Sequence, residues 1–145
     1  MLKAVLDTNI FVSSLLSRTG LPASIIDAWR SGEYLLVTSP PIISEIKRVV
    51  ESPPIQKKYG LGQDEIEKLV FLLEKEALVV PGRSDAAGAV PGDPTDEMFL
   101  AAALDAGADF IVSGDRHLLG LVKYRGTPIL TARQFSEALK GQKTV

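Results

Sequence analysis

The sequence contains no cysteine and only one histidine among its 145 residues. The absence of cysteine excludes disulfide bonds, thiolate metal sites and a cysteine nucleophile. No apolar stretch reaches the roughly 20 residues that a transmembrane helix requires, and the N-terminus shows no signal-peptide pattern. We therefore expect a cytoplasmic protein that has no membrane partner.

The remaining composition is that of an ordinary globular domain. Hydrophobic residues make up 46% and charged residues 23% of the chain, which excludes a disordered segment or a coiled coil. A chain of this length fits one domain, so we expect a single domain over residues 1–145. The net charge of −2 at first argues against a nucleic-acid partner.

Short apolar segments alternate with helical patterns along the whole chain. This alternation predicts an α/β domain whose parallel sheet is covered by helices on both faces. Gly and Pro are concentrated in residues 81–95, which predicts a loop there. Strands are expected at 3–6, 34–39, 78–81, 109–114 and 127–130, and helices at 8–17, 21–32, 40–52, 62–77, 94–107 and 131–140.

Four acidic residues follow these strands. Asp7 ends the first strand, and Glu45 lies in the helix after the second. Asp96 lies at the start of the helix after the third strand, and Asp115 follows the fourth. Segments that leave parallel strands start at one edge of the sheet, where ligand sites gather. The order therefore predicts that the four carboxylates converge on one pocket.

Each acid also has a simpler explanation. Asp7 and Asp115 could cap helices, and Glu45 could be a solvated residue beside an apolar stripe. Asp93, followed by Pro94, has the pattern of an N-cap, with Asp96 in the first turn. Separate caps would not need to share one edge of one sheet, whereas clustered carboxylates repel and need a cation between them. Oxygen-rich sites without Cys or His suit Mg²⁺ or Mn²⁺, so we predict a metal pocket.

The distribution of charge weakens the argument from net charge. When the five acids above are set aside, basic residues outnumber the remaining acids, as in an acidic pocket within a mildly basic surface. This arrangement permits binding of a phosphate polymer. The candidate contacts to an RNA backbone are Arg18, Lys47, Arg48 and Arg116.

Several segments together resemble the PIN-domain family, in particular the prokaryotic toxin-type ribonucleases related to VapC. These segments are LDTNIFVSSLL at the start, SEI in the second-strand helix, DPTDEMFLAAALDAGADFIVSGDRHLL, and the closing PILTARQFSEAL. The resemblance covers nearly the whole chain. It implies a three-layer α/β/α fold with a central, mostly parallel sheet of about five strands.

The resemblance also implies an activity and a set of residues. An acidic cluster would bind Mg²⁺ or Mn²⁺ and cleave RNA as a metal-dependent endoribonuclease. Members of the family often dimerise, and toxin members are inhibited by a small antitoxin protein. Asp7, Glu45, Asp96 and Asp115 match the catalytic and metal-binding acids, and Asp93 matches an additional acid. Thr8, Asn9 and Ser113 match small polar residues that orient the cluster.

The mechanism we expect is metal-assisted hydrolysis of a phosphodiester bond. Asp7, Asp96 and Asp115 would hold metal, and Glu45 would complete the coordination or position a water molecule. Asn9 and Ser113 would hold the carboxylates in orientation. His117 is expected to have a solvent-facing structural role rather than to act as a general base.

Three alternatives compete with this interpretation. A haloacid dehalogenase-type enzyme needs an aspartate two residues after the first, where this chain has Asn9. A receiver-like phosphoacceptor needs an aspartate ending the third strand and a lysine after the fifth, but the chain has LVVPG and TPILTARQ there. A PIN domain that serves only as an RNA- or partner-binding module stays open, although the complete acidic set argues against it.

Overall fold

A six-stranded sheet forms the centre of the computed structural model, which describes residues 1–84, 86 and 96–143. The strand order is β3-β2-β1-β4-β6-β5, and every neighbouring pair is parallel except β5 and β6. The strands are β1 (Lys3–Leu6), β2 (Leu35–Thr38), β3 (Leu78–Val79), β4 (Phe110–Val112), β5 (Lys123–Tyr124) and β6 (Thr127–Leu130).

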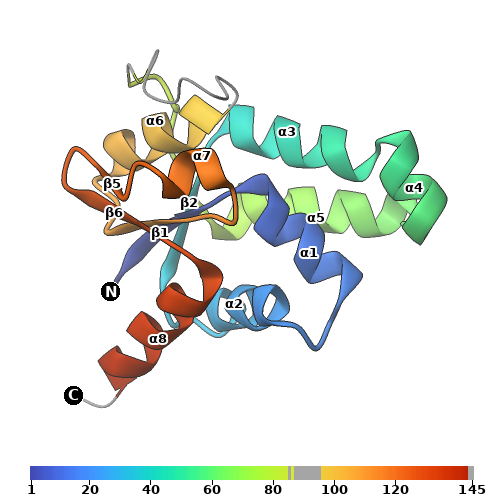
Figure 1. Cartoon of the computed structure of the whole chain (residues 1–145). Coiled ribbons are helices and arrows are strands. Elements are labelled where there is room, and N and C mark those ends of the chain that lie inside the picture. The colour runs from blue at the N-terminus through green and yellow to red at the C-terminus, as the bar shows by residue number, and fades with distance from the viewer. Residues whose placement is uncertain (85, 87–95, 144–145) are drawn as a thin grey trace.

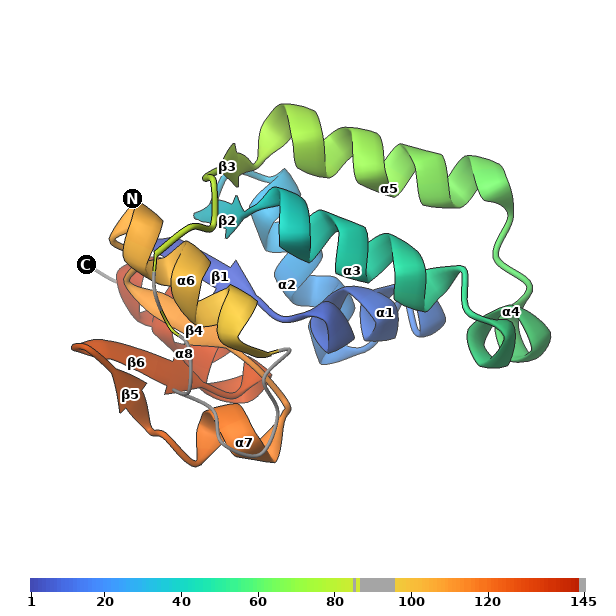
Figure 2. The ribbon, with the colours of Figure 1, turned by 90° about the horizontal axis from the view of Figure 1, so that it is seen from above.

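Helices cover both faces of this sheet, which confirms the predicted three-layer α/β/α fold. Helix α6 packs on one face, and α2 and α8 lie on the other (Figure 1). Helices α1, α3 and α5 lie side by side beyond the carboxyl ends of the strands (Figure 2). The helices are α1 (Thr8–Leu16), α2 (Leu21–Arg30), α3 (Pro40–Val50), α4 (Pro53–Tyr59), α5 (Gln63–Glu76), α6 (Glu97–Ala106), α7 (Arg116–Leu119) and α8 (Ala132–Lys143).

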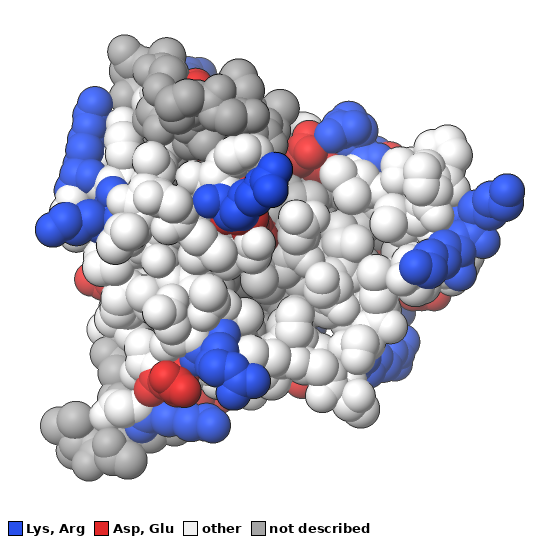
Figure 3. Space-filling view, in the orientation of Figure 1, with Lys and Arg blue, Asp and Glu red and all other residues white. Residues whose placement is uncertain are grey.

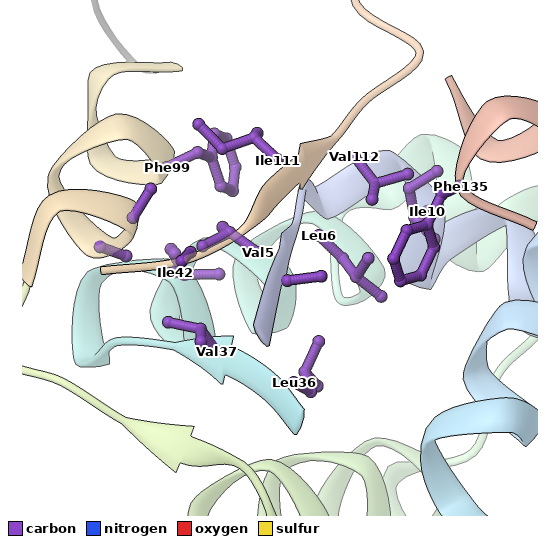
Figure 4. Packing of buried hydrophobic residues seen from close by; sticks show 14 of the residues in the cluster. Val5, Leu6, Ile10, Leu36, Val37, Ile42, Phe99, Ile111, Val112 and Phe135 are labelled. Atoms are coloured by element: carbon purple, nitrogen blue, oxygen red, sulfur yellow. The ribbon is translucent and has the colours of Figure 1, made fainter. Parts of the chain in front are cut away.

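The alternation of side chains along the central strands builds a core on each face. In the parallel register Val5 pairs with Ile111, and Leu6 pairs with Val112, so each pair shares one face. Phe99 of α6 and Phe135 of α8 lie on opposite sides of these strands (Figure 4). Side chains on both faces of these central strands are therefore buried, as expected for parallel strands whose sequences are continuous apolar runs.

A smaller apolar cluster holds the helices that extend past the sheet. Val12 of α1, Val50 of α3 and Ile66 of α5 are buried against one another. This cluster fixes α3 beside α1. As a result, residues midway along α3 face the carboxyl end of β1.

Three short elements were not predicted from the sequence. The helix expected over 40–52 ends at Val50, before Pro53 and Pro54. These two prolines then begin the additional helix α4, because the first turn of a helix needs no N–H donors. Helix α7 has four residues, and β5 forms an antiparallel hairpin with β6, which makes six strands instead of five. Gly107 ends α6 in the left-handed conformation, as the sequence predicts. None of the described helices is both long and apolar enough to cross a bilayer.

Candidate metal centre

The four predicted acids line one small pocket at the carboxyl edge of the sheet. Asp7 follows β1, Glu45 lies in α3, Asp96 precedes α6 and Asp115 precedes α7. The pocket has a volume of about 140 Å³. Its lining consists of Asp7, Thr8, Asn9, Glu45, Val49, Asp96, Phe99 and Asp115. The structure thus brings together residues that are up to 108 positions apart in the numbering of the chain.

Asp7 is the most deeply buried of the four, with 3% of its surface exposed. Its Oδ1 accepts a hydrogen bond from the backbone N–H of Ile10 at 3.1 Å, which caps α1. Its Oδ2 accepts a hydrogen bond from the Ser113 hydroxyl at 2.5 Å. Burial raises the pKa of the Asp7 carboxyl above its ordinary value of 3.8, despite these hydrogen bonds, and the charge of Asp115 raises it further.

Ser113 connects two of the acids. It is fully buried just after β4, where its backbone N–H donates to Leu130 O at 2.9 Å. While its hydroxyl donates to Asp7, the same oxygen accepts a hydrogen bond from the backbone N–H of Asp115 at 2.9 Å. One hydroxyl therefore sets the orientation of the Asp7 carboxylate and the path of the chain that enters Asp115.

Asp115 also caps a helix. Its Oδ1 accepts hydrogen bonds from the backbone N–H groups of His117 at 2.7 Å and Leu118 at 3.2 Å. Asp7 and Asp115 each cap a helix and also line the pocket, so capping and a place in the pocket do not exclude each other. They are compatible because a carboxylate has two oxygens, each with room for more than one partner.

Glu45 is held by a neighbouring cation. Arg48 Nε donates to Glu45 Oε2 at 3.1 Å and Arg48 Nη2 donates to Oε1 at 2.7 Å, so the pair is bidentate. Glu45 lines the pocket, while the Arg48 side chain is 68% exposed. The carboxylate therefore stands at the rim of the pocket, and its direction is set by Arg48.

Among the described residues, Asp96, Asp115 and His117 form a group that could hold a metal ion, with one ligand atom of each within 4.8 Å of the others. The sequence did not predict His117 for this group. The ring was expected to face solvent, and its side chain is indeed 37% exposed. However, its Nδ1 is buried, with no hydrogen-bond partner among the described residues, 3.6 Å from Asp115 Oδ1. The one feature of the sequence that could have indicated His117 as a ligand is its position two residues after Asp115.

The small polar residues differ in their placement. Thr8 is 94% buried in the wall of the pocket, and its Oγ1 has no hydrogen-bond partner within the described part of the chain. Asn9 lines the pocket but is exposed. Asp93 lies outside the described residues. A hydrated divalent cation fits this site, because carboxylate oxygens would bind it and its waters would supply a partner for the buried hydroxyl.

The four predicted RNA contacts all lie on the surface of the protein. Arg18 follows α1, Lys47 and Arg48 belong to α3, and Arg116 begins α7; all four are exposed. Basic atoms lie next to acidic atoms on the part of this face that α3 and α7 occupy (Figure 3). The helices that supply the pocket acids therefore also supply surface cations.

Comparison with known proteins identifies the family. The family model described as PIN domain matches residues 3–117. The chain belongs to the PIN-domain family. Members of this family are typically nucleases, which supports a hydrolase of nucleic acids.

Two similar proteins were also found. An uncharacterized protein of Methanocaldococcus jannaschii is 29% identical over 120 residues, which cover 83% of this chain and 75% of that protein. A chain in the crystal structure of VapBC2 from Rickettsia felis, bound to a DNA fragment from their promoter, shares the fold of this PIN domain. The TM-score is 0.57 at 12% identity, with 90% of this chain and 98% of that chain covered.

Proposed function

We propose that this PIN domain is a divalent-metal-dependent endoribonuclease that hydrolyses RNA phosphodiester bonds at the acidic pocket. The observation that carries the proposal is the convergence of Asp7, Glu45, Asp96 and Asp115 from four separate segments on one pocket. The raised pKa of Asp7 and the buried, unpartnered hydroxyl of Thr8 support the same conclusion, because both call for a cation and its waters.

The roles of the residues follow from their positions. Asp7, Asp96 and Asp115 would hold Mg²⁺ or Mn²⁺, and Glu45 would complete the site or orient the attacking water. The ion would lower the pKa of that water and stabilise charge on the phosphate during in-line displacement. Ser113 holds Asp7 and the chain at Asp115 in place through its two hydrogen bonds. Asn9, exposed at the pocket wall, would orient the same carboxylates.

The exposed cations would bind the RNA backbone beside the pocket. Arg18, Lys47, Arg48 and Arg116 are exposed on three segments of the chain, and Arg48 contacts the pocket acid Glu45, so a strand that crosses the pocket would meet positive charge there. Arg48 would have a second task, since it also fixes the carboxylate of Glu45.

We further propose that the chain is the toxin of a toxin–antitoxin pair, which a small antitoxin protein inhibits, and that it forms a homodimer. The shared fold with a chain of the VapBC2 complex supports an antitoxin partner. Co-expression with the product of a neighbouring small reading frame, followed by size-exclusion chromatography with light scattering, tests both the partner and the dimer.

The experiment that tests the activity is cleavage of end-labelled single-stranded and hairpin RNA with Mg²⁺, Mn²⁺ or EDTA. We expect cleavage with metal and none with EDTA. Asp7→Asn, Asp96→Asn and Asp115→Asn should each abolish cleavage while the protein stays folded by circular dichroism. Asp27→Asn is the matched control, because Asp27 is an exposed acid on α2, outside the pocket; it should cleave like the wild type.

Two outcomes would contradict the proposal. If RNA and metal bind but no metal-dependent cleavage occurs, the domain is a binding module instead of a nuclease. If one of the three variants unfolds, that acid serves the structure, and its assigned role is wrong.

A further inference from the structure

Helix α7 places the only histidine of the chain against two pocket acids. Asp115 caps this helix and accepts the backbone N–H of His117, and Leu118 anchors the helix because it is fully buried. The ring of His117 is therefore held beside Asp115 by backbone geometry and core packing. Its position does not depend on a flexible side chain reaching across the surface.

The Nδ1 atom of this ring has an unexplained environment. It is buried and has no hydrogen-bond partner among the described residues. Asp115 Oδ1, at 3.6 Å, is too far away for a hydrogen bond. A buried nitrogen without a partner is costly, so a ligand that reaches Nδ1 would stabilise the folded protein.

A metal ion suits this nitrogen better than a further hydrogen-bonding group would. Asp96 and Asp115 each place a carboxylate oxygen, and His117 a ring nitrogen, within 4.8 Å of one another, which is close to the span of ligands around one ion. Of the two ring nitrogens, Nδ1 is the one that lies 3.6 Å from Asp115 Oδ1. Thr8, which is nine-tenths buried and unpartnered among the described residues, lies in the wall of the same pocket and could bind a water of that ion. Two carboxylates and one imidazole form a mixed oxygen and nitrogen donor set.

This donor set discriminates between metals. Mg²⁺ is hard and is bound in proteins through carboxylates, phosphates and waters, whereas imidazole nitrogen favours first-row transition ions. We infer that His117 is a metal ligand through Nδ1 and that it makes the centre select a transition ion, such as Mn²⁺, over Mg²⁺. This inference rests on the proposed function, since it concerns the metal of the same pocket.

The test uses the full-length protein without any added histidine tag, loaded with Mn²⁺. Because the chain has a single histidine, imidazole nitrogen detected on the bound ion by electron spin-echo modulation can come only from His117. We expect this signal in the wild type and in the control Asp27→Asn. The variant His117→Asn, which keeps size and neutrality and offers an amide oxygen at the position of Nδ1, should still bind Mn²⁺ without the imidazole signal.

Calorimetric titration gives the second readout. In the wild type, Mn²⁺ should bind more tightly than Mg²⁺, and His117→Asn should reduce this preference by about tenfold or more. If the wild type binds Mn²⁺ without an imidazole signal, or if His117→Asn leaves the preference unchanged, the inference is overturned while the proposed nuclease stands. If neither ion binds the wild type, the proposed function fails, and the inference fails with it.

Discussion

Substitution of Ser113 by alanine tests the link between the two acids directly. The hydroxyl of Ser113 donates to Asp7 Oδ2 at 2.5 Å and accepts from the N–H of Asp115 at 2.9 Å, and the residue has no exposed surface. Ser113→Ala removes both hydrogen bonds while changing the volume of the side chain by one oxygen atom. The effect therefore reports on the hydrogen bonds and hardly at all on packing.

The size of the effect follows from these two contacts. A hydrogen bond to a charged group contributes about 1.5–3 kcal/mol, and a buried N–H that loses its partner costs about 1–3 kcal/mol. Water that enters the site would recover part of this, so we expect a loss of about 3 kcal/mol in the free energy of unfolding. For a chain of this length that corresponds to a fall in Tm of roughly 6–12 °C. Metal affinity should fall by about tenfold, since the carboxylate of Asp7 loses its orientation.

Ser39→Ala is the matched control. Ser39 is as buried as Ser113 and caps α3, and its hydroxyl accepts from Ile42 N at 3.4 Å. Within the described part of the chain, this hydroxyl makes no hydrogen bond to any of the four acids. Loss of such a cap costs about 1 kcal/mol, and metal affinity should be unchanged. Thermal unfolding and calorimetric titration of both variants provide the comparison. If Ser113→Ala matches Ser39→Ala in both Tm and metal affinity, the proposed link between Asp7 and Asp115 is refuted.

Two further predictions concern charge. In EDTA, Asp7→Asn should have a higher Tm than the wild type at neutral pH. The pKa of Asp7 is raised in the folded protein, so the wild type loses stability as this carboxyl ionises. The difference in Tm should therefore shrink as the pH falls towards 3.8, the ordinary pKa of the group. Measurement of Tm from about pH 3.5 to about pH 8 tests this, and a gap that grows on acidification would show that burial does not cause the shift. Arg48→Ala should leave Tm nearly unchanged, because its pair with Glu45 is exposed. It should weaken RNA binding and reduce the slope of affinity against salt concentration by about one. Arg30→Ala is the matched control, since Arg30 forms an exposed ion pair with Glu76 at 3.4 Å, away from the pocket. If the two variants bind RNA with equal affinity, Arg48 does not contact the RNA.

Much of the fold could be predicted from local patterns. The strands around residues 3–6, 109–114 and 127–130 are short apolar runs, and the helices between them carry clear caps and ends, such as Gly107. The place of the acids followed from one rule of topology, because segments that leave parallel strands begin at the same edge. That rule brought Asp7 and Asp115 together without any knowledge of side-chain positions.

The short elements could not be predicted in the same way. Helix α7 and strand β5 are too brief to show periodicity, and α4 begins with two prolines that usually signal an end. Of the three, α7 is held by the buried side chain of Leu118, and β5 by its pairing with β6, which are tertiary contacts that local sequence does not encode.

The residue types and chain order by themselves determined that this protein is an α/β domain with acids gathered at one edge of its sheet. Only the tertiary structure decided how those acids are held: Ser113 between Asp7 and Asp115, Arg48 on Glu45, and Nδ1 of His117 facing the cluster. The reason is physical. The positions of strands and helices along the chain follow from hydrophobic periodicity, which local sequence carries. A hydrogen bond of about 3 Å depends instead on rotamers that only the packed neighbours select.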